Sequence, residues 1–175
     1  SYQGIKYDGV IGLSFFKNFG QVTFDFKNQK VILGEYEIDS TPIKMVEVNI
    51  LDNIFYEIPI YINGNPDTAI IDFGTKGFAV IRENFGRAKH DFKDEDYLKS
   101  FDKSLLDWNS YINIESLQVG NFVLENVKCQ NSKGRLMNIP DIVRNVIFYN
   151  NTIGIEFFKD KIVQFDFENN LFYVK

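Results

Sequence analysis

Two stretches near opposite ends of the chain decide the fold: VIGLSFFKNFGQVTFDFKNQKVIL, residues Val10–Leu33, and TIGIEFFKDKIVQFDFENNLFYV, residues Thr152–Val174. They share a glycine, an aromatic pair and an alternation of aromatic residues in the same order, at an offset of 142 that becomes 141 after one deletion. We call Val10–Leu33 the first repeat and Thr152–Val174 the second repeat. Solenoid repeats recur about every 20 to 50 residues. The offset between these two repeats is much longer, and it therefore indicates a duplicated lobe.

Each repeat has the pattern of a short closing unit. It predicts a tight glycine turn, a short helix that carries the Phe-Phe pair, and two strands. The strands are expected to join at Lys27–Gln29 in the first repeat and at Glu168–Asn170 in the second. The first strand is predicted from its period of two, which places Val22, Phe24 and Phe26 on one face.

The same alternation places Asp25 and Asp166 opposite the aromatic residues, so both carboxylates are expected to face outward. A unit of about 34 residues is too small to bury an aromatic face by itself. The first repeat must therefore pack on the second lobe, on a partner chain, or on an N-terminal half that precedes it. We interpret the chain as the C-terminal part of a longer, duplicated protein.

A polar connector with a proline, residues 35–42, is the predicted boundary between two parts of the chain. Residues 1–34 are interpreted as the closing segment of a preceding first lobe, most of which would lie upstream. Residues 43–175 are interpreted as a complete second lobe.

The second lobe begins with a predicted hairpin. Apolar and β-branched residues over Met45–Ile50 and Tyr56–Ile62 indicate strands, and Asn63-Gly64 followed by Asn65-Pro66 is a strong turn signal. The returning strand, Thr68–Ile71, ends at Asp72. Further predicted elements are a strand over 78–81, a hairpin over 112–127 that turns at Gly120-Asn121, a helix over 95–106 and a loop over 134–151. The expected fold class is all-β, with one or two short helices.

Composition removes much of the usual catalytic repertoire. The 175 residues are 45% hydrophobic and carry a net charge of −5, so the chain lacks the basic surface that nucleic acid or anionic lipid requires. No apolar run approaches the roughly 20 residues of a membrane helix. The single cysteine, Cys129, and single histidine, His90, exclude an intrachain disulfide and a Cys/His zinc site. A Ser-His-Asp or Cys-His catalytic arrangement would be possible only with His90 as the base. Carboxylates are the catalytic groups that remain in number.

Three pieces of the sequence together resemble a known family. They are YINGNPDTAIIDFGTKGFAVI over 61–81, INIESLQVGNFVLENVKC over 112–129, and the apolar-apolar-Gly turn with its short helix, which occurs once in each repeat. Their order resembles that of the retropepsin/pepsin-like aspartic peptidases, especially the two-lobed bacterial proteins of that kind. The resemblance covers the whole second lobe and the end of the first.

The resemblance implies an aspartic-type endopeptidase that acts on peptides or proteins without a metal or cofactor. Asp72 would be one of two aspartates that share a proton and activate water. Gly74 would keep the turn tight, Thr75 would support it through its hydroxyl, and Ile153-Gly154 would pack beneath it. An extracytoplasmic location, in the periplasm, at the surface or secreted, is favoured by the resemblance, and insertion into a membrane is not expected.

The sequence departs from the family pattern at several points. Phe73 stands where the family usually has a Thr or Ser that bonds to the other lobe, and no glycine marks a flap between Gly86 and Gly120. The second aspartate is expected about 70 positions before Ser1 if the repeat offset holds upstream. It would otherwise come from a second copy of the chain.

Two alternatives follow from these departures. Asp72 could be a turn-forming aspartate at a strand end, and the protein could be a catalytically inactive pepsin-like module that binds extended peptides by strand addition.

Overall fold

The structure, a computed structural model, describes residues 11–50, 53–75, 77–81, 111–131 and 150–175 of the chain. These residues form the following elements in chain order: α1 (Leu13–Phe16), η1 (Lys17–Phe19), β1 (Gln21–Asp25), β2 (Lys30–Leu33), β3 (Ile43–Lys44), β4 (Val46–Ile50), β5 (Asn53–Ile62), β6 (Asn65–Ile71), β7 (Ala79–Ile81), β8 (Tyr111–Val119), β9 (Phe122–Asn131), β10 (Asn151–Ile153), α4 (Ile155–Phe158), β11 (Ile162–Asp166) and β12 (Leu171–Val174). The all-β prediction is confirmed. The helix predicted over 95–106, His90 and nearly all of the 134–151 loop lie outside the described residues.

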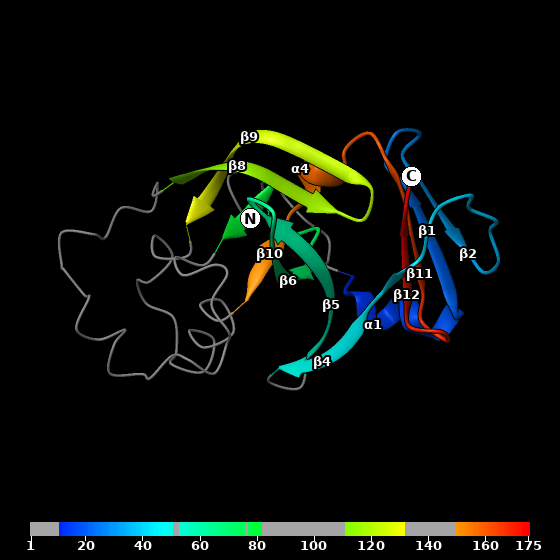
Figure 1. Cartoon of the computed structure of the whole chain (residues 1–175). Coiled ribbons are helices and arrows are strands. Elements are labelled where there is room, and N and C mark those ends of the chain that lie inside the picture. Colours follow the sequence, from blue (N-terminus) through cyan, green and yellow to red (C-terminus); the bar gives the residue numbers. More distant parts are fainter. Residues whose placement is uncertain (1–10, 51–52, 76, 82–110, 132–149) are drawn as a thin grey trace, which may run out of the picture.

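The larger of two sheets closes on itself. Its strand order is β4-β5-β6-β10-β7-β9-β8, and β5 also pairs with β8 through Tyr61 and Gln118. The long strand β5 therefore pairs with three strands: with β6, with β4 near its start and with β8 near its end. Figure 1 shows this closed sheet beside the smaller sheet, which contains the two paired strands of each repeat.

Both predicted hairpins of the closed sheet are confirmed. Asn63 and Gly64 have φ values of +51° and +75°, and the strands pair directly around them through Ile62 and Asn65. Positive φ at both central residues is the geometry of the turn that matches the twist of a hairpin. The predicted turn residues Asn65 and Pro66 belong instead to the start of β6. The second hairpin turns at Gly120, as its positive φ of +55° allows.

The smaller sheet brings the two repeats together around a local two-fold axis. Its order is β2-β1-β11-β12-β3, and β1 runs antiparallel to β11. In this register Thr23 pairs with Gln164, its own counterpart in the repeat, and the Gln164 amide donates a hydrogen bond of 3.1 Å to the Thr23 hydroxyl. The Phe26 amide donates to the Lys161 carbonyl at 3.1 Å, and the same bond recurs with the repeats exchanged at 2.9 Å. The two similar stretches of sequence therefore have matching local structures, related by this axis.

The expectation that Asp25 and Asp166 face outward is wrong. Both side chains are buried. Each accepts two hydrogen bonds from the turn that follows it, from the backbone and side-chain amides of Asn28 in the first repeat and of Asn169 in the second, at 2.7 to 2.9 Å. The bonds from Asn28 lower the pKa of Asp25 below its ordinary value, and the side-chain bond contributes more to this than the backbone bond. The two aspartates are thus internal supports of the hairpin turns.

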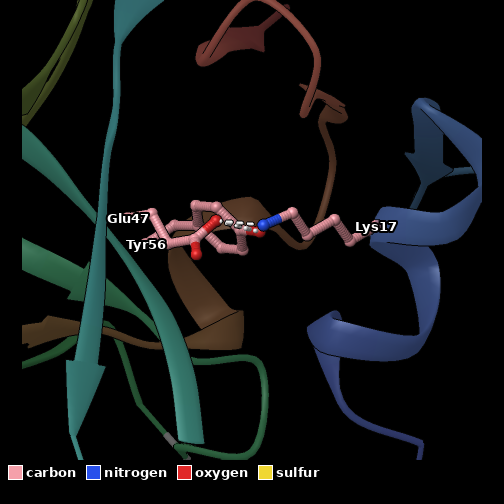
Figure 2. Close-up of polar contacts among 3 residues, drawn as sticks. All are labelled: Lys17, Glu47 and Tyr56. Carbon is pink, nitrogen blue, oxygen red and sulfur yellow. Dashed lines mark hydrogen bonds and ion pairs between the residues drawn. The ribbon is translucent and has the colours of Figure 1, made fainter.

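The first repeat packs on residues 43–175, the part of the chain interpreted as the second lobe, which is one of the three positions that its small size allowed. Phe24 lies in the same core as Phe158 and Phe165 of the second repeat. Figure 2 shows Lys17 reaching from the helical segment of the first repeat to Glu47 on β4, where it forms an ion pair. The buried Tyr56 hydroxyl donates to the same Glu47 carboxylate at 3.4 Å.

Residues 35–42, the predicted linker, form no helix or strand but do contact the smaller sheet. The Ser40 hydroxyl donates to the Val174 carbonyl at 2.8 Å, and the Gln164 side chain donates to the Tyr36 carbonyl at 2.6 Å. Strand β3, which follows, joins the sheet by pairing Ile43 with Phe172. This connector therefore lies along the sheet that holds the two repeats.

Candidate active site

Asp72 lies where the chain must leave one strand and cross over another. Strands β6 and β7 follow one another in sequence, but β10 lies between them. Ile153 of β10 pairs in parallel with Ile71 and antiparallel with Ala79. The segment that starts at Asp72 therefore passes around the end of β10, which brings this turn against the start of the second repeat's helix.

The carboxylate of Asp72 organises its own turn. Its Oδ1 accepts a hydrogen bond from the Gly74 amide and its Oδ2 accepts one from the Thr75 hydroxyl, each at 2.8 Å. The Thr75 amide donates to the Asp72 carbonyl at 3.0 Å. The Thr75 side chain is buried, Asp72 is half-buried and Gly74 is exposed. These are the bonds of a turn-forming aspartate, yet each carboxylate oxygen retains capacity to accept another hydrogen bond.

The turn is seated on the glycine of the second repeat. The Asp72 amide donates to the Ile153 carbonyl and the Ile155 amide donates to the Thr75 carbonyl, each at 3.1 Å. A Cβ at Gly154 would lie 2.7 Å from the Thr75 carbonyl oxygen and against the Gly77 carbonyl oxygen. Glycine is needed here because the two backbones approach so closely. The structure thus brings together the predicted site residues Asp72, Gly74, Thr75, Ile153 and Gly154, while their catalytic role stays a prediction.

Phe73 turns its ring into an aromatic cluster. The centroid of the ring lies 5.2 Å from that of Phe24, 5.0 Å from Phe26, 5.5 Å from Phe158 and 6.0 Å from Phe165, and all four pairs are edge-to-face. At this position the resemblance implies a Thr or Ser that bonds to the other lobe. Phe24 and Phe26 were not predicted as neighbours of the site, although their alternation in the repeat was the visible signal.

The remaining candidate groups behave as structural residues. Cys129 is buried, and its burial raises the pKa of the thiol to about 12, as suits a small buried hydrophobic residue. The described ranges contain no group of three or more His, Cys, Asp or Glu side chains that could hold a metal ion. Of the helices in the described part of the chain, none has the length and apolar character required to cross a membrane.

Comparison with known proteins gives a similarity at the level of the fold. No protein-family model matches the chain, and no curated protein matches it. Among solved structures, the chain is similar to a retropepsin-like aspartic protease from Rickettsia conorii, with 12% sequence identity and a TM-score of 0.36, over 81% of this chain and 99% of that chain. A similarity of this size concerns the fold alone and assigns no activity to the chain.

Proposed function

We propose that this chain supplies one half of the active site of an aspartic-type endopeptidase, with Asp72 as the catalytic carboxylate. The observation that supports this most is the seat of the Asp72 turn: a half-buried carboxylate at the end of β6, held against the Gly154 turn by backbone hydrogen bonds. A carboxylate fixed in this way has a defined direction, as a general base requires.

The chemistry needs a second carboxylate. Two aspartates a few ångströms apart share one proton, because both cannot ionise cheaply in that geometry. The ionised member takes a proton from water as the water attacks the peptide carbonyl, and the protonated member then passes a proton to the leaving amine. The Gly74 amide and Thr75 hydroxyl hold Asp72 in place without using all of its lone pairs.

We place the second carboxylate in a matching lobe seated on Gly12. This glycine repeats the backbone conformation of Gly154, with φ and ψ of −83° and 163° against −91° and 173°. Among the described residues, a Cβ at Gly12 would approach nothing closer than the Ser14 hydroxyl, at 3.6 Å. The adjacent Ile11 and Phe15 are exposed. The matching lobe would come from sequence upstream of Ser1 or from a second copy of the chain.

The test is an assay of the gene product that contains this chain, with any sequence encoded upstream, on an unfolded protein. The assay spans about pH 3 to 7, which includes the range in which carboxylate pairs share a proton. We expect cleavage that pepstatin inhibits and that Asp72→Asn abolishes. Asp160→Asn is the matched control, because Asp160 is exposed and follows α4. Cleavage that persists in Asp72→Asn would contradict the proposal. Absence of cleavage by the wild-type protein across this pH range would also contradict it.

A second candidate function is the binding of extended peptides without cleavage. Strand β2 lies at an edge of the smaller sheet, and Val31 and Leu33 on it are 52% and 48% exposed. An exposed edge of this kind can accept a further strand. Saturable binding of an unfolded peptide that Asp72→Asn leaves intact and Leu33→Lys removes would favour this function over the peptidase.

A further inference from the structure

The Asp72 turn is attached to the rest of the protein in two ways. Its backbone bonds run to the second repeat, through Ile153 and Ile155. The ring of Phe73 contacts the second repeat as well, but it also contacts Phe24 and Phe26 of the first repeat. Phe73 therefore links the turn to both repeats at once.

The contacts of this ring have the geometry of a specific fit. All four neighbouring rings meet Phe73 edge-to-face, with interplanar angles between 72° and 83°. Aromatic pairs prefer this arrangement over face-to-face stacking. A ring held on four sides has little freedom to rotate or shift, and the backbone that carries it continues directly into Asp72.

We propose that Phe73 is a positioning residue, whose ring, held by both repeats, fixes the direction of the Asp72 carboxylate. Its consequence for catalysis rests on the proposed function. The structure thus gives Phe73 a supporting role at the site. Replacement of Phe73 by Ser, the kind of residue that the resemblance leads one to expect here, should therefore weaken the site, because a hydroxymethyl group leaves the space between the four rings unfilled.

The duplication provides a matched control. Phe26 and Phe167 occupy equivalent positions in the two repeats. The Phe26 ring lies 5.0 Å from that of Phe73, whereas the Phe167 ring lies 5.1 Å from that of Tyr56. Phe26→Leu and Phe167→Leu therefore remove similar aromatic contacts, and only the first removes a contact with Phe73.

The experiment measures the backbone amide resonances of Gly74 and Thr75 by NMR, because both amides bond to Asp72. We expect Phe73→Ser to shift and broaden both resonances, Phe73→Leu to do so less, Phe26→Leu to shift them, and Phe167→Leu to leave them in place. If Phe73→Ser does not fold, the three leucine variants decide the question. Unchanged resonances in Phe73→Leu and Phe26→Leu would overturn the proposal, as would equal shifts in Phe167→Leu.

Activity gives a second readout in an assembly that cleaves peptides. Misplacement of a catalytic group by about 1 Å costs about a hundredfold in rate. We expect Phe73→Ser to lower kcat by about that factor with KM unchanged, and Phe167→Leu to retain kcat. A kcat that is unchanged in Phe73→Ser would count against Phe73 as a positioning residue. Since the NMR measurement requires no cleavage, failure of the proposed function and failure of this inference remain distinguishable.

Discussion

The two repeats have the same local structure in different surroundings. Each begins with a glycine that precedes a short helix, and each ends in two strands joined by a turn that an aspartate supports. In the second repeat Ile153 and Phe157 are fully buried. In the first repeat their counterparts, Ile11 and Phe15, are 65% and 50% exposed.

This difference separates what the sequence of a repeat decides from what its neighbours decide. The helix forms after the glycine in both repeats, so the turn and helix follow from local sequence. Burial follows from the closed sheet, because β10 lies inside that sheet and carries the second repeat's Ile153 with it. Matched substitutions in the two repeats should therefore change stability by unequal amounts.

The largest difference is expected at the aromatic pair. Phe157→Ala removes a fully buried ring and should lower the free energy of unfolding by about 4 kcal/mol. Phe15→Ala removes a half-exposed ring that contacts Phe16 and Phe19, and should cost about 1 kcal/mol. Urea unfolding of the two variants beside the wild type measures both values. Equal losses would mean that Phe15 is buried in solution, as docking of the chain on a second copy would cause.

The next difference is expected at the two glycines. Gly154→Ala forces a Cβ against the carbonyl oxygens of Thr75 and Gly77, and should cost about 3 kcal/mol. Among the described residues, the Cβ that Gly12→Ala adds would make only an ordinary contact with the Ser14 hydroxyl, at 3.6 Å. This substitution should therefore change the stability of the chain by less than about 0.5 kcal/mol.

Thermal unfolding of the same two variants measures their stability, and size-exclusion chromatography with the matching lobe measures assembly. We expect Gly12→Ala to weaken assembly despite its near-normal stability, because a Cβ at position 12 would prevent a turn of the matching lobe from packing closely there. If Gly12→Ala leaves assembly unchanged, the matching lobe does not pack on Gly12.

Much of this fold could be predicted because its signals are local. The period of two in β1 predicts a strand, and Asn63-Gly64 predicts a hairpin turn, each from only a few residues. The burial of Asp25 and Asp166 was missed, since alternation shows only that they oppose the aromatic residues. The sequence nevertheless contained a signal, because each aspartate is followed three residues later by an asparagine that can cap the turn.

The candidate site was predictable only in part. The turn at Asp72 and its glycine seat followed from a resemblance that covers both segments. The direction of the Phe73 ring could not be predicted, because it depends on the packing of Phe24 and Phe26 from a distant part of the chain. Side-chain direction at such a point is set by tertiary contacts, which a local pattern does not encode.

A smaller difference is expected where the two-fold axis passes through unlike residues. Gln164→Leu removes the donor to the Thr23 hydroxyl and to the Tyr36 carbonyl, and should cost about 2 kcal/mol. Thr23→Val removes one acceptor and leaves Gln164 bonded to Tyr36, so it should cost about 1 kcal/mol. Urea unfolding separates the two values. A larger loss in Thr23→Val would mean that the connector does not depend on Gln164.

The smallest expected effect is the loss of stability at low pH that arises from Asp25 in the first repeat. Hydrogen bonds from Asn28 lower the pKa of Asp25 in the folded protein, so the folded state binds this proton less tightly than the unfolded chain does. The stability that these bonds provide is therefore complete above the ordinary pKa of 3.8 and is lost as the pH falls through the lower, folded-state value. We expect the free energy of unfolding to decline below about pH 4. Asn28→Ala should decline less steeply, because it removes the bond that lowers this pKa most. Urea unfolding at a series of pH values measures both slopes, and a variant as acid-sensitive as the wild type would show that other carboxylates govern the decline.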